Sequence, residues 1–191
     1  MTDIPLWQYS ASQIATATQN GDISAEVAVR AAVARMRYIN PELNAVVEDL
    51  GEAAIERAAK LDHQRSAGQP CGPLHGVAVT VKINVDQAGH ATSNGVVALK
   101  DNMAHQDAPV VRNLTKAGAV VIGRTNTPEF SFRADTDNPL HGRTHNPWGQ
   151  HVSPGGSSGG AAAAVMSGCG ALASGNDIGG SLRFPAAANG A

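Results

Sequence analysis

The first third of the chain places apolar residues at the spacing of α-helices, with polar residues between them. Ser10 precedes one such segment, which ends near Gly21, and Ser24 precedes a longer one over residues 25–39. A serine in this place accepts a hydrogen bond from one of the first free backbone N–H groups, and so caps a helix. Because proline lacks a backbone N–H, Pro41 predicts the end of the longer helix.

The hydrophobic pattern changes after the glycines and prolines of residues 68–73. Before them, residues 43–47 predict a short strand, and residues 51–66 predict a helix rich in Ala, Glu and Lys. After them, residues 75–82 form a nearly continuous apolar and β-branched run. Such a run is typical of a strand that is buried on both faces of a sheet.

The remaining pattern alternates helices with strands. Residues 107–117 predict an amphipathic helix, and the apolar residues 119–123 predict the strand after it. A small-residue helix is expected over residues 159–166, and a short strand over residues 171–174. Helices linked to strands by tight glycine turns are typical of an α/β fold with a largely parallel sheet. Residues 135–152 form a long irregular stretch, which is usually functional in a compact domain.

The composition argues against several partners. Lys and Arg total 14 and Asp and Glu total 16, so the net charge is -2, without the basic excess that nucleic acid or an anionic membrane attracts. We expect neither signal peptide nor membrane span, because no apolar run is long enough. Cys71 and Cys169 form no CxxC pair, which favours a reduced, cytoplasmic protein. His141 and His145 lie in a loop where no glutamate completes a zinc motif, so we expect no metal site.

Two glycine loops that carry serines lie near the end of the chain, at residues 153–160 and 177–183. Glycines allow successive backbone N–H groups to point at one place, where they stabilise a developing oxyanion. Ser181 directly follows two such glycines and could attack the same carbonyl group. The alternatives are a glycine-rich turn or a phosphate cradle, although neither loop has the P-loop pattern and the dinucleotide pattern fits poorly.

A lysine is the candidate base, since no histidine lies beside a nucleophile-like motif. A serine hydroxyl is a weak nucleophile until a base takes its proton. Lys82 ends an apolar strand, where removal from water disfavours the ammonium form and lowers the pKa from its usual value of about 10.4. The alternatives are a lysine that extends to solvent from the strand end, or one paired with an acid such as Asp86.

Taken together, these segments resemble the amidase signature family. The resemblance rests on the strand that ends at Lys82, on both glycine loops, and on ordered motifs at residues 107–111, 117–130 and 144–148. It covers roughly residues 70–191, and more loosely the helical N-terminus. Members of the family are usually far longer than this chain.

The resemblance implies a mixed central sheet flanked by helices. Residues 1–70 would form an N-terminal helical segment. Residues 71–191 would form the first part of the catalytic core, which would be incomplete at its C-terminal end. We therefore expect the isolated 191-residue chain to be marginally stable and prone to aggregate through exposed strand edges.

The resemblance also implies a role for individual residues. Ser181 would be the nucleophile, Ser157 the bridging serine after a cis peptide from Gly156, and Lys82 the base. The backbone N–H groups of four consecutive residues would form the oxyanion hole: Ile178, Gly179, Gly180 and Ser181. Three further polar residues would support the site: Ser158, Asp177 and Arg183.

The chain departs from the family at two positions. Ile83 follows the lysine where the family often has an aspartate. Asn176 precedes the aspartate of the second glycine loop where the family often has a threonine. Neither position performs the implied chemistry, but both can change how the site is tuned.

The implied reaction is hydrolysis of a carboxylic amide to an acid and ammonia or an amine through a serine acyl-enzyme. We expect a small-molecule amide as substrate, no cofactor, no nucleic-acid or membrane partner, and a possible homodimer of the full-length protein. Two alternatives remain open. The chain could belong to the amidase subunit of a tRNA-dependent amidotransferase, or it could be a non-catalytic piece.

Overall fold

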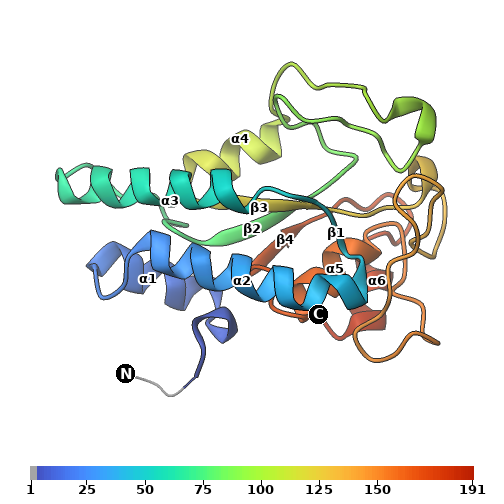
Figure 1. The fold of residues 1–191 in the computed structure, drawn as a ribbon, viewed down its shortest axis with the longest axis horizontal. Helices are drawn as coiled ribbons and strands as arrows, with labels where there is room; N and C mark the ends of the chain where they lie inside the picture. Colours follow the sequence, from blue (N-terminus) through green and yellow to red (C-terminus); the bar gives the residue numbers. More distant parts are fainter. Residues whose placement is uncertain (1–3) are drawn as a thin grey trace.

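The computed structural model describes residues 4–191 and contains a four-stranded sheet with helices packed around it (Figure 1). The strand order is β1-β3-β2-β4. β2 runs parallel to β3 and β4, whereas β1 is antiparallel to β3, so the expected mixed α/β sheet is confirmed. The strands are β1 (Val46–Asp49), β2 (Ala78–Lys82), β3 (Val120–Thr125) and β4 (Leu172–Ser174).

The described residues contain six α-helices, and none of them is long and apolar enough to cross a membrane. The predicted N-caps are confirmed, since the Ser10 hydroxyl accepts from the backbone of Gln13 and the Ser24 hydroxyl from that of Val27. The helices are α1 (Ala11–Asn20), α2 (Ala25–Leu43), α3 (Gly51–Ser66), α4 (Pro109–Lys116), α5 (Gly159–Met166) and α6 (Arg183–Asn189). Short 3-10 turns lie at Leu6–Gln8, Val97–Leu99 and Glu129–Ser131.

The expectation that Pro41 ends the second helix is wrong. α2 continues past Pro41, and Asn44 ends it in the left-handed conformation with a φ of 49°. Because Pro41 lies in the last turn, its missing N–H removes one backbone hydrogen bond, to the carbonyl four residues back, shortly before the helix ends. The Asn40 side chain stabilises the exit, since it accepts from the backbone N–H groups of Ala45 and Val46 at 3.0 and 2.8 Å.

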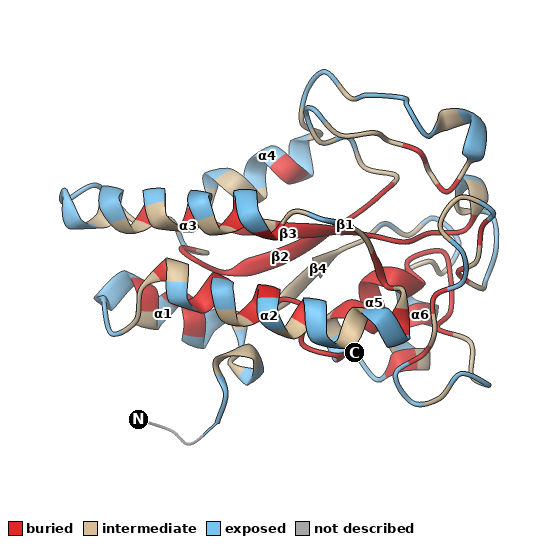
Figure 2. Ribbon diagram, in the orientation of Figure 1, coloured by how far each residue is buried: buried red, intermediate tan, exposed pale blue. Residues whose placement is uncertain are grey.

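The hydrophobic core joins the N-terminal helices to the sheet. One cluster of buried side chains includes residues of α2, α3, α5 and three strands, and Figure 2 shows these buried positions on the inner sides of the helices. Its members include Val29, Met36, Leu61, Ile122 and Cys169. The cluster therefore spans both predicted segments, and the boundary near residue 70 stays a prediction.

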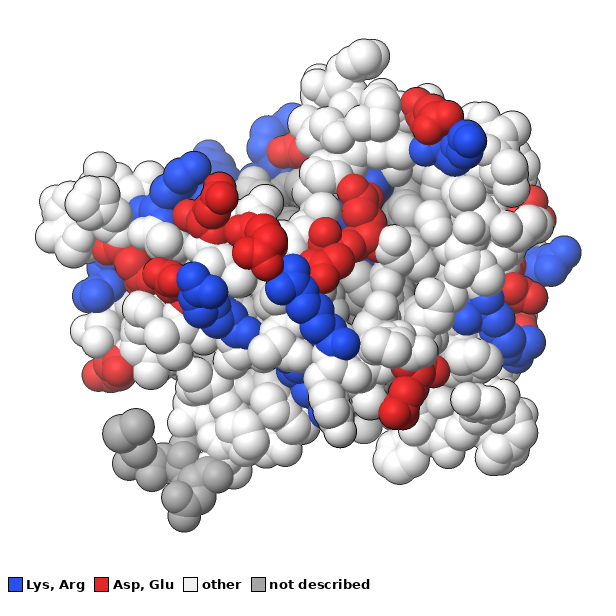
Figure 3. Space-filling model, in the orientation of Figure 1, with Lys and Arg blue, Asp and Glu red and all other residues white. Residues whose placement is uncertain are grey.

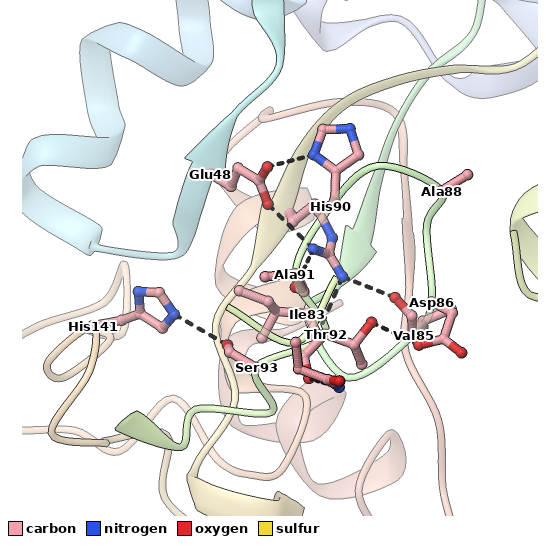
Figure 4. A network of polar contacts seen from close by, with 12 residues as sticks. Glu48, Ile83, Val85, Asp86, Ala88, His90, Ala91, Thr92, Ser93 and His141 are labelled. Atoms are coloured by element: carbon pink, nitrogen blue, oxygen red, sulfur yellow. Dashed lines mark hydrogen bonds and ion pairs between the residues drawn. The ribbon is translucent and has the colours of Figure 1, made fainter. Parts of the chain in front are cut away.

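A buried arginine fixes the loop that follows β2. The guanidinium of Arg124, on β3, is fully buried and donates to the backbone carbonyls of Ala91 at 2.6 Å and Val85 at 2.9 Å. Glu48 of β1 lies 3.2 Å from it and also bonds to His90 (Figure 4). Burial lowers the pKa of Arg124, and the Glu48 carboxylate opposes that effect. One cation thus connects β1, β3 and the loop after β2.

Replacing Glu48 tests this buried ion pair. We expect Glu48→Gln to lower the free energy of unfolding by about 1–3 kcal/mol, because the buried guanidinium loses its counter-charge. The matched control is Glu52→Gln, whose side chain is 78% exposed beside Arg37. The control should change the free energy by less than about 1 kcal/mol. Urea denaturation measures both, and equal effects would contradict the role given to Arg124.

Candidate active site

Lys82 is the last residue of β2 and is fully buried. All five residues of that strand are buried, and Lys82 pairs with Thr125 of β3. The predicted position at the end of a buried strand is therefore confirmed. The side chain neither extends to solvent nor pairs with Asp86, whose carboxylate instead accepts from the Thr92 hydroxyl at 2.6 Å.

The amine of Lys82 contacts both predicted glycine-loop regions. Its Nζ atom lies 2.7 Å from Oγ of Ser157 and 3.0 Å from Oγ of Ser158, both in the first loop. It also lies 2.9 Å from Oδ1 of Asn176, immediately before the second loop. Residues that are distant in sequence therefore meet at a single buried nitrogen.

Burial changes the acid–base behaviour of this nitrogen. The pKa of Lys82 is lowered from 10.5 to about 8, mainly because removal from water disfavours the ammonium ion. The negative charge of Asp177 acts in the opposite direction. An amine with this pKa is partly neutral near physiological pH and can accept a proton.

The first loop holds Ser157 through its backbone. The Gly156–Ser157 peptide is cis, as the resemblance implied. The hydroxyl of Thr127 donates to the carbonyl of Ser157 at 3.0 Å. A side chain at position 156 would overlap the backbone carbonyl of Arg133, so the loop requires glycine there. These contacts fix the Ser157 backbone, and its side chain is buried beside Lys82.

The helix after this loop, α5, packs closely because its residues are small. Residues 159–164 are all buried. A Cβ atom at Gly160 would lie 2.5 Å from the backbone nitrogen of Asn126 and 2.8 Å from the carbonyl oxygen of Ala45. The expected small-residue helix is thus confirmed, and its close approach places the first loop against the ends of the strands.

Asp177 organises the second loop. Its carboxylate accepts from the guanidinium of Arg183 at 3.0 Å, and from the backbone N–H groups of Gly180 at 2.7 Å and Leu182 at 3.1 Å. The Arg183 side chain and these backbone groups hold the pKa of Asp177 well below its usual range. The Asp177 side chain is 16% exposed and that of Arg183 is 77% exposed, so the ion pair closes the loop at the protein surface.

Ser181 lies at the end of this second loop and links the two loops. Its carbonyl oxygen accepts from the backbone N–H of Ser158 at 3.2 Å. Within residues 4–191, the Ser181 hydroxyl has no hydrogen-bond partner, whereas the Ser157 hydroxyl is bound to Lys82. The predicted base Lys82 and the predicted bridging serine Ser157 are therefore in contact, whereas the hydroxyl of the predicted nucleophile Ser181 is unbound.

The backbone N–H groups of the second loop differ in what they contact. The N–H of Gly180 already donates to Asp177. Those of Ile178, Gly179 and Ser181 have no acceptor in the part of the chain that the structure describes. Three of the four groups expected in the oxyanion hole are thus free to donate to a ligand.

Two asparagines at the site were not predicted from the sequence as contacts of the lysine. Asn176 was noted only as a departure from the family, yet it bonds directly to Lys82. Asn84 pairs with Asn176 through two amide hydrogen bonds. Their place in the sequence could have indicated a contact with the lysine, because Asn84 follows Lys82 by two residues and Asn176 directly precedes Asp177. The other departure, Ile83, is a buried apolar residue with 3% exposure.

The described residues offer no metal centre at this site or elsewhere. No group of three His, Cys, Asp or Glu side chains within residues 4–191 is placed to hold a metal ion. The contacts of Lys82 are two hydroxyls and an amide oxygen, a set suited to proton transfer.

Several known proteins are similar to this chain over most of its length. Indoleacetamide hydrolase of Bradyrhizobium diazoefficiens is 59% identical over 97% of this chain and 36% of its own length. One component of the glutamyl-tRNA(Gln) amidotransferase of Symbiobacterium thermophilum is 41% identical over 89% of this chain and 35% of its own length. The crystal structure of a bacterial aryl acylamidase of the amidase signature family superposes with a TM-score of 0.92 and 34% identity, covering 96% of this chain and 38% of that one.

The chain thus spans less than two fifths of the length of each of these relatives. Within that span, the Amidase family model matches residues 27–191, which include the buried lysine and both serine loops. The matched length, the superposition and the Lys82–Ser157 contact agree, and the chain belongs to the amidase signature family.

Proposed function

We propose that the protein hydrolyses a carboxylic amide through an acyl-enzyme on Ser181, with Ser157 and Lys82 as a proton relay. The observation that carries this proposal is the 2.7 Å contact between Nζ of Lys82 and Oγ of Ser157. A fully buried amine with a pKa lowered to about 8 is suited to take a proton from a hydroxyl.

The first half of the reaction forms the acyl-enzyme. Ser181 gives its proton to Ser157 as Ser157 gives its own to Lys82, and Oγ of Ser181 bonds to the carbonyl carbon. The free N–H groups of the second loop stabilise the oxyanion. The C–N bond then breaks, and the leaving nitrogen takes the proton back through the same relay. The required bond from Ser181 to Ser157 would form with substrate, since catalytic hydrogen bonds often tighten only in the complex.

The second half of the reaction releases the acid. Water gives a proton to the relay and attacks the acyl carbon, and Ser181 recovers its proton as the ester bond breaks. Asp177 and Arg183 support both halves, because their ion pair holds the loop whose N–H groups face the oxyanion. Ser158 supports them through its contact with Lys82.

The similarity to an indoleacetamide hydrolase favours a small arylacetamide as substrate, with indoleacetamide as the first compound to assay. The second candidate is the amidase component of a tRNA-dependent amidotransferase, which the 41% identity to one such component supports. Both use amide hydrolysis. Turnover of a small amide by the protein alone favours the first, and turnover of glutamine only with a partner protein favours the second.

The surface charges agree with a small-molecule substrate. On the face seen in Figure 3, acidic and basic side chains lie side by side over α2 and α3, and the basic ones form no large patch. A nucleic-acid surface would need a basic patch. Cys71 and Cys169 are unpaired, which supports a cytoplasmic location as part of this proposal. The homodimer stays a prediction.

Removing the nucleophile or the base tests the relay. Ser181→Ala and Lys82→Ala should each lower kcat for a small amide at least about a thousandfold, because each leaves the relay without a required group. Ser66→Ala, at the exposed end of α3, is the control and should retain parental turnover. Mass spectrometry after treatment with a fluorophosphonate should find the label on Ser181. Turnover that survives Ser181→Ala, or a label on another serine, would show the assignment to be wrong.

The pH dependence of turnover tests the state of the lysine. Because only the neutral amine can accept a proton, kcat/KM should rise about tenfold per pH unit below pH 8 and level off above it. A series of initial rates between pH 6 and pH 10 measures this profile. A flat profile over that range would contradict the role of Lys82 as the base.

A further inference from the structure

The three oxygen neighbours of the Lys82 amine are not chemically equivalent. An ammonium group has three N–H donors and could donate to all three oxygens. A neutral amine has two N–H donors and one lone pair. To act as a base toward Ser157, the amine must direct that lone pair at the Ser157 hydroxyl and its two N–H groups at the other neighbours.

The other two neighbours are both set to accept. Oδ1 of Asn176 is a carbonyl oxygen, which cannot donate, and lies 2.9 Å from the amine. The hydroxyl of Ser158 donates its single proton to the backbone carbonyl of Asn176 at 3.3 Å, so its oxygen faces Lys82 as an acceptor. Both N–H groups are thereby engaged, and the lone pair is left for Ser157.

The orientation of the Asn176 amide is fixed by a second amide. Nδ2 of Asn176 donates to Oδ1 of Asn84 at 3.1 Å, and Nδ2 of Asn84 donates to Oδ1 of Asn176 at 3.3 Å. Asn84 also donates to the hydroxyl of Ser131 at 3.1 Å, and that hydroxyl donates to Asn94 at 3.0 Å. A flip of the Asn176 amide would place an NH₂ group against Lys82 and break the reciprocal pair.

We propose that Asn176, held by Asn84, is a positioning residue that keeps the lone pair of neutral Lys82 directed at Ser157. The inference rests on the proposed function, since it assigns a task within the same proton relay. It also explains why an asparagine can stand where the family often has a threonine: the amide supplies the acceptor, and its partner Asn84 prevents the flip.

The charges around the amine determine how this can be tested. The charged group that acts on Lys82 is Asp177, whose carboxylate is bound by Arg183. Asn176→Asp preserves the shape of the side chain and adds a second negative charge at the contacting atom. An opposite charge at this distance stabilises the ammonium form by about one to three pKa units.

The first experiment compares pH profiles of the protein and its Asn176→Asp variant on one small amide. We expect the rise in kcat/KM to move up by at least about one pH unit, with at least about tenfold lower kcat/KM at pH 7 and most of the activity recovered at high pH. Asn113→Asp, which adds the same charge on the exposed side of α4, should keep the parental profile. A parental profile for Asn176→Asp would overturn the inference.

A second pair of variants removes the amides altogether. Asn176→Ala should lower kcat about 10- to 100-fold with little change in KM, because the amine loses an acceptor but the substrate keeps its contacts. Asn84→Ala should lower kcat less, since Asn176 remains but can flip. An unchanged kcat for Asn176→Ala also overturns the inference.

Ser181→Ala separates this inference from the proposed function. If that variant is inactive while Asn176→Asp and Asn176→Ala behave like the parent, the positioning role is wrong and the relay stands. If Ser181→Ala retains turnover, the proposed function is wrong and the positioning role falls with it.

Discussion

The rest of the structure depends on a single constraint, which is that the Lys82 amine is held away from water. An ammonium ion in that place is costly, and the cost is what lowers the pKa of Lys82 to about 8. The amine is tolerated because three oxygens surround it. Each of those oxygens comes from a segment that the fold must bring to the end of β2. The packing of the fold therefore determines the chemistry of the site.

Close packing behind the site brings these segments to the end of β2. β2 lies between two parallel neighbours, which removes Lys82 from solvent. α5 approaches the strands because Gly160 leaves no side chain in the way. The loop after β2 is fixed by the buried guanidinium of Arg124, and the second glycine loop by the Asp177–Arg183 pair. Two ion pairs, Arg124–Glu48 and Asp177–Arg183, thus hold the segments that carry the polar groups.

Much of this could be predicted from local patterns. The apolar strands, the serine caps and the glycine loops are all visible as short-range spacing, and the serines and the lysine could be placed on them. Other features could not. Pro41 stays inside α2, where the side chain of Asn40 stabilises the turn that follows. The polar residues Arg124 and Thr125 extend β3, because the guanidinium of Arg124 donates to backbone carbonyls that are distant in sequence. The Asn84–Asn176 pair joins residues 92 apart, which no local pattern reveals.

The central claim is that burial lowers the pKa of the amine at position 82 to about 8, so that it is partly neutral near physiological pH. Nitrogen-15 NMR of the lysine side-chain amines, with Lys82→Met to assign the resonance, measures its titration directly. We predict a midpoint near pH 8, well below the usual lysine pKa of about 10.4. A Lys82 amine that remains an ammonium ion up to about pH 10 would contradict this claim.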